Sequence, residues 1–515
     1  MIERSNARVA RFFAFAIGPL LLAAAVLRFY DLEHNPPGLW QDEASTGLDA
    51  WLIATSGRDQ HGAPWPIIAR SFGDYPLAGY RYLDALVVSA FGLSIATERV
   101  VAAIAGTALV GVASAFSWLA FGSIAALGTL ASAALCPTWI HFSRYGSEAI
   151  LLPLTLTAGA TLFEAGKRPH RRSLWIAGAI CAGLSAYTYH AVKVVLPIWI
   201  IGVIVYLHKE IRETWASDRR VIVATALVFT AVVLPSVMVS FSVGGQARGR
   251  TVLAWYHHEG LELLRVIALS YLSYFDLGML FVRGGPVVAQ SIPYAGLWSL
   301  FDLPLILAAL WALATKRLPR AGGFVLFWFL LGPLPGGLTP DIQNIGRAIA
   351  WLPSPNVLSG VGFAVLLGLI PVRFVSTGLA IVALAWTITL GQIAYETLLV
   401  YPRNNERDWQ FEISAAMKCA KEHRGRRSII VAPEFQLASV FARFHFYDLG
   451  EPGGLRPFSL GRRTRLGPDE IYAFPASQPK PVNGEELCSI RSKRDPTPRA
   501  FVYGSTVAAD RAPSE

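Results

Sequence analysis

The sequence predicts a mostly α-helical, polytopic membrane protein with a small α/β domain at its C-terminal end. Three features of the composition predict the membrane class. Hydrophobic residues make up 53% of the 515 residues, charged residues make up 16%, and the mean hydropathy is +0.44. Soluble globular proteins usually carry about 25% charged residues, and disordered chains combine low hydrophobicity with high charge. The composition therefore excludes a soluble protein and, for most of the chain, a disordered one.

Eleven apolar stretches are candidate membrane spans, because a helix needs about 20 apolar residues to cross the hydrocarbon core. The first runs from about Phe12 to Leu27. It follows three arginines and precedes no clear cleavage site, which predicts an uncleaved signal anchor with a cytoplasmic N-terminus. The other ten stretches start near Val100, Ser123, Ala149, Leu174, Val194, Val221, Leu297, Phe324, Ala348 and Phe374.

The segment Tyr82–Ile95 decides the orientation of all later spans. It is apolar but short and contains Asp84, so it is either a span or a helix that lies in the membrane interface. If it lies in the interface, the basic clusters between later spans all fall on the cytoplasmic side, as the positive-inside rule requires. The basic residues concerned are Lys167, Arg168, Arg171, Arg172, Lys209, Arg212, Arg219, Arg220, Lys316, Arg317, Arg320 and Arg373.

With an interfacial helix at this point, three segments face the outside: Tyr30–Tyr80, His141–Glu148 and Ser242–Tyr294. From about Tyr401 the chain is polar to its end. We therefore expect two domains, a membrane domain over residues 1–400 and an extracytoplasmic domain over residues 401–515.

The extracytoplasmic domain has the pattern of a small α/β fold. A helix-like stretch near Asp408–Lys421 precedes a strand-like run, Ser428–Pro433. Cys419 and Cys488 both fall in this domain and could form a disulfide in an oxidising compartment. The other two cysteines lie in apolar runs, which favours a packing role.

The first outer loop carries a pair of carboxylates, Asp42 and Glu43, just before a helix-like run, Ala44–Thr55. Prolines at positions 36, 37, 64 and 66 impose turns on this loop, and a loop of this length in a compact protein is usually functional. The local pattern also has a purely structural interpretation, in which Asp42 is the N-cap and Glu43 favours the helix dipole.

Several motifs occur in the order and loop placement of a known family. The Asp42–Glu43 pair follows the first span, Phe91–Ser94 precedes the pair Glu98–Arg99, and further motifs lie at Pro137–Glu148, Tyr187–Lys193 and Gly346–Pro353. Together, over about residues 20–400, they resemble the GT-C glycosyltransferases. These include the protein O-mannosyltransferases and the aminoarabinose transferases of glycosyltransferase family 39. Interfacial helices in the first outer loop are a fold feature of this family.

The resemblance implies a role for three acidic residues. Sugar transfer from a polyprenyl phosphate to a hydroxyl needs a base for the acceptor proton and cations for the leaving phosphate. Asp42 matches the catalytic aspartate of the family and would be the general base of an inverting displacement. Glu43 would position either the acceptor or only the helix. Glu148 would be a second active-site acid, or else the partner of Arg144 in a local ion pair.

The resemblance also implies cations that contact the donor phosphate or its sugar. Arg144, His190, Lys193 and Arg347 are the candidates, although Lys193 at a helix end also fits a lysine that reaches to the headgroups. Related enzymes often carry a lysine beside the acidic residue that matches Asp74, and this chain has Tyr75 there. Arg70 or Arg81 is therefore expected to supply that charge.

A metal is not required by the sequence. In the aminoarabinose branch, a loop histidine and a first-loop acid can hold zinc. His257 or His258 could act with Asp74 or Glu43, but their spacing identifies no site and an exposed histidine pair fits as well. No dinucleotide or phosphate-loop motif occurs, so a nucleotide-sugar donor is not expected.

We therefore expect a hexosyl- or pentosyltransferase in the bacterial inner (plasma) membrane. It would transfer one sugar from a polyprenyl-phosphate donor to a glycolipid, polysaccharide or protein on the extracytoplasmic face. The net charge of +10 marks cytoplasmic loops and anionic lipid contacts rather than nucleic acid. The alternatives are a transporter or lipid flippase, which would show inverted repeats, and a non-catalytic envelope assembly protein.

Overall fold

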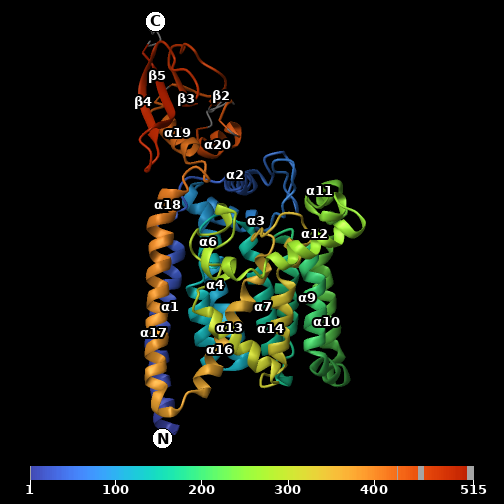
Figure 1. Cartoon of the computed structure of the whole chain (residues 1–515). Coiled ribbons are helices and arrows are strands. Elements are labelled where there is room, and N and C mark those ends of the chain that lie inside the picture. The colour runs from blue at the N-terminus through green and yellow to red at the C-terminus, as the bar shows by residue number, and fades with distance from the viewer. Residues whose placement is uncertain (1, 426, 436, 450–457, 507–515) are drawn as a thin grey trace. The chain divides into compact units, whose positions relative to one another are not determined.

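The structure is a computed structural model that describes residues 2–425, 427–435, 437–449 and 458–506 (Figure 1). The chain folds into two compact units. The first, here called the helical unit, comprises Met1–Tyr30, Pro66–Tyr80 and Val100–Leu398. The second, the mixed unit, comprises Asp31–Trp65, Arg81–Arg99 and Leu399–Glu515. The mixed unit thus contains the C-terminal domain together with two segments of the first outer loop.

Each of the eleven apolar stretches forms a helix. They are α1 (Ile2–Phe29), α4 (Ile95–Phe121), α5 (Ser123–Ala134), α7 (Leu151–Ala165), α8 (Leu174–Leu184), α9 (Val192–Tyr206), α10 (His208–Ser240), α13 (Asp302–Ala314), α14 (Arg320–Leu331), α16 (Pro353–Leu369) and α17 (Val375–Tyr395). Five helical stretches of the described chain are long and apolar enough to cross a membrane alone, and shorter apolar helices accompany them. The prediction of a mostly helical, polytopic membrane protein is confirmed.

Within the helical unit, α16 packs against both α5 and α13, and α8 packs against both α7 and α10. Glycines allow the first of these contacts. A Cβ atom added to Gly360 of α16 would lie 2.1 Å from Thr129 Oγ1 and 2.3 Å from the Ala125 carbonyl oxygen of α5. One added to Gly362 would lie 1.7 Å from the Leu305 carbonyl oxygen of α13. Small residues let membrane helices approach until their backbones touch, which maximises dispersion and weak polar contacts.

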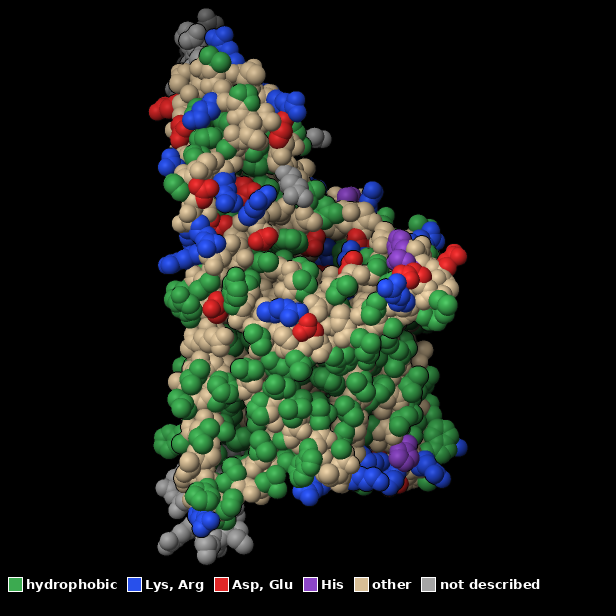
Figure 2. Space-filling model, viewed as in Figure 1, with side chains coloured by type: hydrophobic (Ala, Val, Ile, Leu, Met, Phe, Trp, Pro, Cys, Tyr) green, Lys and Arg blue, Asp and Glu red, His purple; other side chains and the backbone are tan. Residues whose placement is uncertain are grey.

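The helical unit carries a broad belt of hydrophobic side chains, and basic side chains gather at one end of it (Figure 2). The basic clusters lie in the connection α7–α8, in the first part of α10, in the connection α13–α14 with the start of α14, and in the connection α16–α17. Helix α10 itself is kinked at Asp218, which separates its polar first part from the apolar remainder. The helices therefore place the clusters that the sequence assigned to the cytoplasm together at one end of this unit.

Shorter helices complete the outer segments. The first outer loop contains two helices, α2 (Gln41–Ser56) and α3 (Gly79–Phe91). Helix α3 has 13 residues, and its part from Arg81 onward belongs to the mixed unit with the first outer loop rather than to the helical unit. The interfacial placement of Tyr82–Ile95 is thereby favoured over a span. The remaining helices of the helical unit are α6 (Pro137–Phe142), α11 (Val243–Val252), α12 (Gly260–Ser273) and α15 (Leu334–Gly337).

The C-terminal part of the mixed unit is an α/β fold, as predicted. Its helices are α18 (Tyr401–Asn404), α19 (Phe411–Glu422) and α20 (Ala438–His445). Its strands are β1 (Ser428–Val431), β2 (Phe458–Leu460), β3 (Glu470–Pro475), β4 (Gly484–Arg491) and β5 (Pro498–Ser505), in the order β2-β1-β3-β5-β4. Strand β1 pairs in parallel with β2 and β3, and β5 pairs antiparallel with both β3 and β4. Ile429 lies opposite Ile471, and Tyr472 lies opposite Tyr503.

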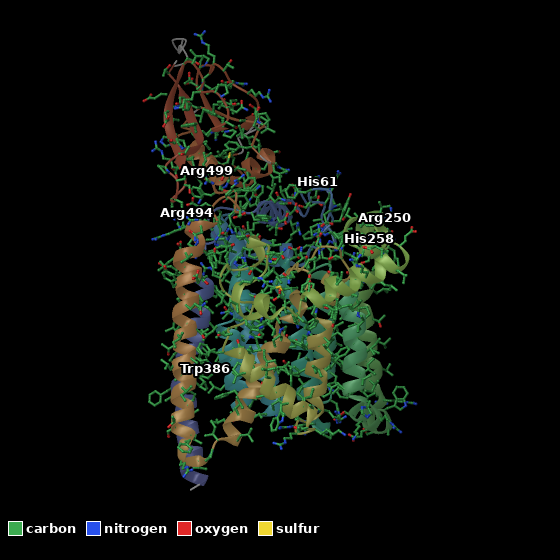
Figure 3. All side chains as sticks on the ribbon, viewed as in Figure 1. His61, Arg250, His258, Trp386, Arg494 and Arg499 are labelled. Atoms are coloured by element: carbon green, nitrogen blue, oxygen red, sulfur yellow. A yellow bond between two sulfur atoms is a disulfide. The ribbon has the colours of Figure 1, made fainter. Side chains whose placement is uncertain are left out.

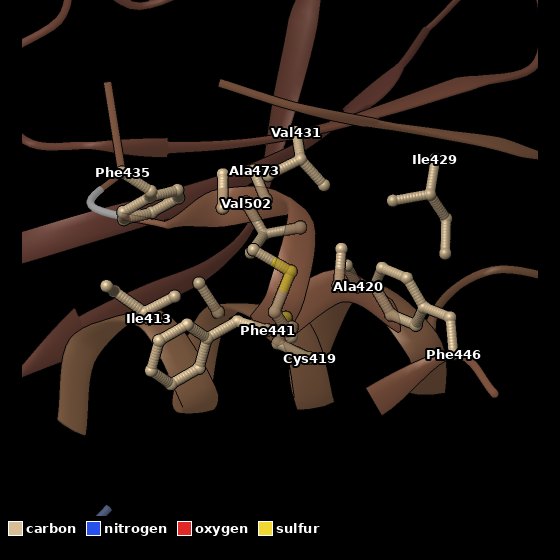
Figure 4. Close-up of a cluster of buried hydrophobic side chains, with 14 of the residues drawn as sticks. Ile413, Cys419, Ala420, Ile429, Val431, Phe435, Phe441, Phe446, Ala473 and Val502 are labelled. Carbon is tan, nitrogen blue, oxygen red and sulfur yellow. The ribbon is translucent and has the colours of Figure 1, made fainter. Parts of the chain in front are cut away.

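A disulfide ties helix α19 to strand β4 in the core of this domain. Cys419 and Cys488, 69 positions apart, are bonded, and the bond lies among buried apolar side chains that include Ile413, Phe441 and Val502 (Figure 4). The bridge left open by the sequence is therefore present in the structure. It closes the loop that contains most of the sheet.

We expect the contact between α5 and α16 to be sensitive to a single methyl group. Gly360→Ala should lower the free energy of unfolding by about 1–3 kcal/mol, because the Cβ overpacks the interface. Gly368→Ala is the matched control in the same helix, because a Cβ there meets no atom within 4 Å. Thermal unfolding of the purified chain in detergent measures both. Equal unfolding temperatures for the two variants would contradict the close contact.

Removal of the disulfide should destabilise the C-terminal domain. A bridge that closes a loop of this length restricts the unfolded chain and so raises the free energy of unfolding by about 4 kcal/mol. Cys419→Ser combined with Cys488→Ser should therefore raise the rate of protease cleavage within residues 420–487 under native conditions. Cys181→Ser, outside this domain, serves as the control. An unchanged cleavage rate in the double variant would show that packing alone holds α19 on the sheet.

Candidate functional site

Asp42 is presented at the start of helix α2. The helix begins at Gln41, and Trp40 occupies the N-cap position, so the interpretation of Asp42 as the N-cap is wrong. Asp42 instead lies in the first turn with its side chain exposed, and its Oδ2 accepts a hydrogen bond from Trp40 Nε1 at 3.3 Å. An exposed carboxylate in the first turn favours the helix dipole and is also accessible to a reactant.

Glu43, the neighbouring carboxylate, is fully buried and bound by Arg99 of α4. Arg99 Nε donates to Glu43 Oε1 at 2.8 Å, and Nη2 donates to Oε2 at 2.9 Å. The remaining guanidinium hydrogens go to three backbone carbonyls of the first outer loop, those of Leu32, Pro36 and Gly38, at 2.7–2.9 Å. All five donors of the arginine are therefore used. Glu43 also accepts from the Trp40 amide at 2.8 Å, so it holds the helix start next to Asp42.

A second buried ion pair holds the other end of the first outer loop. Arg81 Nε donates to Asp49 Oδ2 at 2.9 Å, and both side chains are buried. Asp49 Oδ1 in turn accepts from the Gln60 amide. Asp84, one turn further along α3, is buried without a hydrogen-bond partner in the described part of the chain. Burial raises the pKa of Asp84 well above its ordinary value, which the charge of Arg81 opposes only in part. Arg81 is thus engaged in positioning α2.

In the helical unit, four of the predicted residues lie around one cavity of about 240 Å³ or contact its lining. His190, Lys193 and Arg347 line it, together with Tyr189, Tyr256 and Arg248. Lys193 Nζ donates to the Gly245 carbonyl oxygen at 2.6 Å. The described lining therefore contains three cationic side chains and no carboxylate. The cavity lies at the first turn of α9, opposite the end of α9 that leads into the basic first part of α10 at Lys209.

Asp74 contacts this wall through two residues. Its Oδ2 lies 3.1 Å from Arg248 Nη1, and its Oδ1 lies 3.7 Å from His190 Nε2. The cation that accompanies Asp74 is therefore Arg248 of α11, while Arg70 is exposed. Tyr75, where relatives often have lysine, packs against Gly244.

Arg347 and Glu148 complete the surroundings of the cavity. Arg347 Nη2 lies 2.7 Å from Asp341 Oδ2, while its Nη1 is buried without a hydrogen-bond partner among the described residues. Burial raises the pKa of Tyr189, and the charges of Arg248, Glu148, Arg347 and Asp74 also act on its hydroxyl. Glu148 is therefore close enough to influence the same wall.

Arg144 is buried beside the end of helix α1. Its Nη1 donates to the Leu27 carbonyl oxygen at 2.7 Å, and its Nη2 donates to that of Tyr30 at 2.6 Å. A cation at a helix C-terminus satisfies carbonyl groups that have no partner within the helix. These contacts give Arg144 a structural role, whatever further role it has.

Two of the residues considered for zinc, Asp74 and His257, have other partners in the structure. Asp74 faces the Arg248 guanidinium, which would repel a bound cation. His257 Nε2 lies 3.1 Å from the Thr251 carbonyl oxygen, and His258 lies in the same loop, near Arg250 (Figure 3). Within the described ranges, the one cluster with metal-ligand spacing is Cys419, His423 and Cys488, whose sulfurs form the disulfide.

Sequence reasoning missed Arg248. It lies 174 positions after Asp74, and no spacing rule connects the two. The available signal was its place in the outer segment Ser242–Tyr294, in a short stretch, Val243–Val252, that has glycines at its start and can form a helix.

Comparison with solved structures finds the same fold over nearly the whole chain. The crystal structure of ArnT from Cupriavidus metallidurans bound to undecaprenyl phosphate matches with a TM-score of 0.55 and 14% identity, covering 98% of this chain and 99% of that one. The apo form of the same protein matches with a TM-score of 0.54 and 14% identity, covering 99% and 100%. No protein-family model and no curated protein sequence matches. The chain has the GT-C fold, and this prediction is confirmed.

We expect the Glu43–Arg99 pair to be indispensable for folding of the mixed unit. Arg99→Met would leave Glu43 and three carbonyl groups buried without their donor. Loss of one partner of a buried ion pair costs about 3–5 kcal/mol. Arg58→Met is the control, because Arg58 is exposed and donates to one carbonyl of the same loop. Thermal unfolding in detergent distinguishes them, and wild-type stability of the Arg99 variant would contradict this role.

Proposed function

We propose that this protein is a membrane glycosyltransferase that moves one monosaccharide from a polyprenyl-phosphate carrier to an acceptor on the extracytoplasmic face. The observation that carries the proposal is the cation-lined cavity at one end of the helical unit. Arg248, Lys193 and Arg347 offer fixed positive charge, and charge-assisted hydrogen bonds from such groups are the usual means of holding a phosphate. The fold supports it, because a protein with this fold, ArnT, is described as bound to undecaprenyl phosphate.

The placement of the cavity supports an outward-facing site. The basic connections lie at the opposite end of the same helices, and the positive-inside rule assigns them to the cytoplasm. A lipid-linked sugar suits such a site, because a nucleotide sugar would not be supplied there. We assign the protein to the bacterial inner membrane, with residues 401–515 as an extracytoplasmic domain.

The residues have different roles in this proposal. Asp42, exposed at the start of α2, is the general base that takes the acceptor proton. Glu43 positions Asp42 through its bonds to Arg99 and to the Trp40 amide. Glu148 is a second acid near the cavity.

Phosphate binding involves a second group of residues. Arg248 and Arg347 bind the carrier phosphate, with Lys193 and His190 beside them. Asp74 holds Arg248 and His190 in position until the phosphate arrives. Arg144 and Arg81 support the site through backbone and side-chain contacts. The sugar is a hexose or pentose, and the acceptor is a glycolipid, a polysaccharide or a protein.

Phosphate binding is testable with undecaprenyl phosphate as the probe. Arg248→Gln should weaken its binding to the purified chain by roughly tenfold to a hundredfold, because one charged hydrogen bond contributes about 1.5–3 kcal/mol. Arg250→Gln is the matched control, since Arg250 lies on the same helix but binds Gln246 and is exposed. Equal affinities for the two variants would refute the assignment of the cavity.

The role of Asp42 as general base can be tested by measuring sugar transfer. The purified protein is mixed with sugar-loaded undecaprenyl phosphate and with an envelope extract that supplies the acceptor, and the release of undecaprenyl phosphate is measured. Asp42→Asn should reduce the transfer rate by about 100- to 10,000-fold and leave undecaprenyl-phosphate binding unchanged. Asp31→Asn, an exposed carboxylate of the same loop that contacts His34, serves as the control. A near wild-type rate for Asp42→Asn would contradict the base and would point to an acceptor that attacks through a phosphate oxygen.

A further inference from the structure

Four exposed cations gather where the C-terminal domain continues from helix α17. Arg403 lies on α18, Arg407 follows it, and Lys493 and Arg494 lie in the loop between β4 and β5. None of the four forms an ion pair with another residue that the structure describes, whereas Lys418 and Arg463 of the same domain do. We call these four residues the basic collar.

The collar is one structural feature, although its members are about 90 positions apart. The Lys493 amide donates to both carboxylate oxygens of Glu406, at 3.2 and 3.1 Å, and Glu406 is buried. Arg494 is labelled at this end of the domain in Figure 3, with Arg499 close by. The strand connection is therefore fixed beside the segment that carries Arg403 and Arg407.

The loop itself is ordered by local hydrogen bonds. The Arg494 amide donates to Ser492 Oγ at 3.2 Å, and the Thr497 amide donates to Asp495 Oδ1 at 2.9 Å. The cations of the collar outnumber the exposed carboxylates of its two segments, Asp408 and Asp495. A fixed, net positive surface results.

The chain itself sets the depth of the collar. Val372–Asn404 is one continuous helical stretch of 33 residues, which extends about 50 Å, whereas a bilayer with its headgroups is about 40–45 Å thick. From Phe374 to Tyr395 the helix carries no charged residue, which is a length of about 33 Å, and Glu396 follows. Arg403 lies about 12 Å further along the axis, so its long side chain reaches the zone within about one Debye length of the outer headgroups.

We propose that the basic collar binds the phosphates of anionic lipids in the outer leaflet and so holds the β4–β5 loop on the membrane surface. Lysine and arginine near an anionic bilayer each strengthen attachment roughly fivefold. The cavity in the helical unit is a separate site. The proposal depends on insertion of the helix Val372–Asn404 and is independent of sugar transfer.

The test uses the full chain in nanodiscs with a fluorophore on the loop. Pro496→Cys, exposed and central in the loop, carries the label, and a nitroxide on the lipid headgroups quenches it. Quenching should be stronger in nanodiscs that contain phosphatidylglycerol than in pure phosphatidylcholine, and high salt should remove the difference. Val482→Cys, 89% exposed at the other end of β4, should show no such difference. Background labelling is measured on the chain without an added cysteine.

Charge variants then identify the residues. Lys493→Gln with Arg494→Gln should weaken attachment roughly 25-fold and abolish the phosphatidylglycerol effect. Arg462→Gln with Arg465→Gln removes the same charge elsewhere in the domain and should preserve the effect. Two results would overturn the proposal. One is equal quenching in both lipids for the chain labelled at Pro496→Cys without charge substitutions. The other is an equal loss of quenching in both variant pairs. Loss of quenching on addition of inorganic phosphate at constant ionic strength would also overturn it, because the ligand would then be a soluble anion.

Discussion

The mixed unit depends on one arginine. Arg99 reaches from the start of α4 and uses every guanidinium hydrogen, two on Glu43 and three on carbonyls of the first outer loop. A buried charge is tolerated only when it is paired and its hydrogen bonds are satisfied, and here both conditions are met by residues distant in sequence. The loop path, the entry into α2 and the exposure of Asp42 all follow from this anchor.

The cavity of the helical unit is organised on a different principle. Its described lining contains no carboxylate; Arg248 pairs with Asp74 and Arg347 with Asp341 from outside the lining, and Lys193 contacts a backbone carbonyl. Like charges held together are costly unless a counter-charge is present. A bound anion would add counter-charge to that of Asp74 and Asp341, which is the physical basis of the proposed phosphate site.

Sequence reasoning predicted the eleven helices and the C-terminal α/β domain, because these follow from local hydrophobicity and from the period of apolar residues. It was less successful for single residues. Asp42 was considered as an N-cap, but the helix begins at Gln41 and Trp40 holds the cap. Arg248 was overlooked, because its partner Asp74 is on another segment. The roles of the nine candidate residues stay predictions.

The sequence alone determined the membrane class and the common end of the basic loops, since the transfer of apolar side chains and the placement of lysine and arginine are properties of single segments. It also determined that acidic and basic residues would gather in the outer segments. Only the tertiary structure decided which of them meet. Electrostatic energy depends on distance in space, and chain folding brings Glu43 to Arg99, Asp74 to Arg248 and Glu406 to the Lys493 amide across separations that no local pattern encodes.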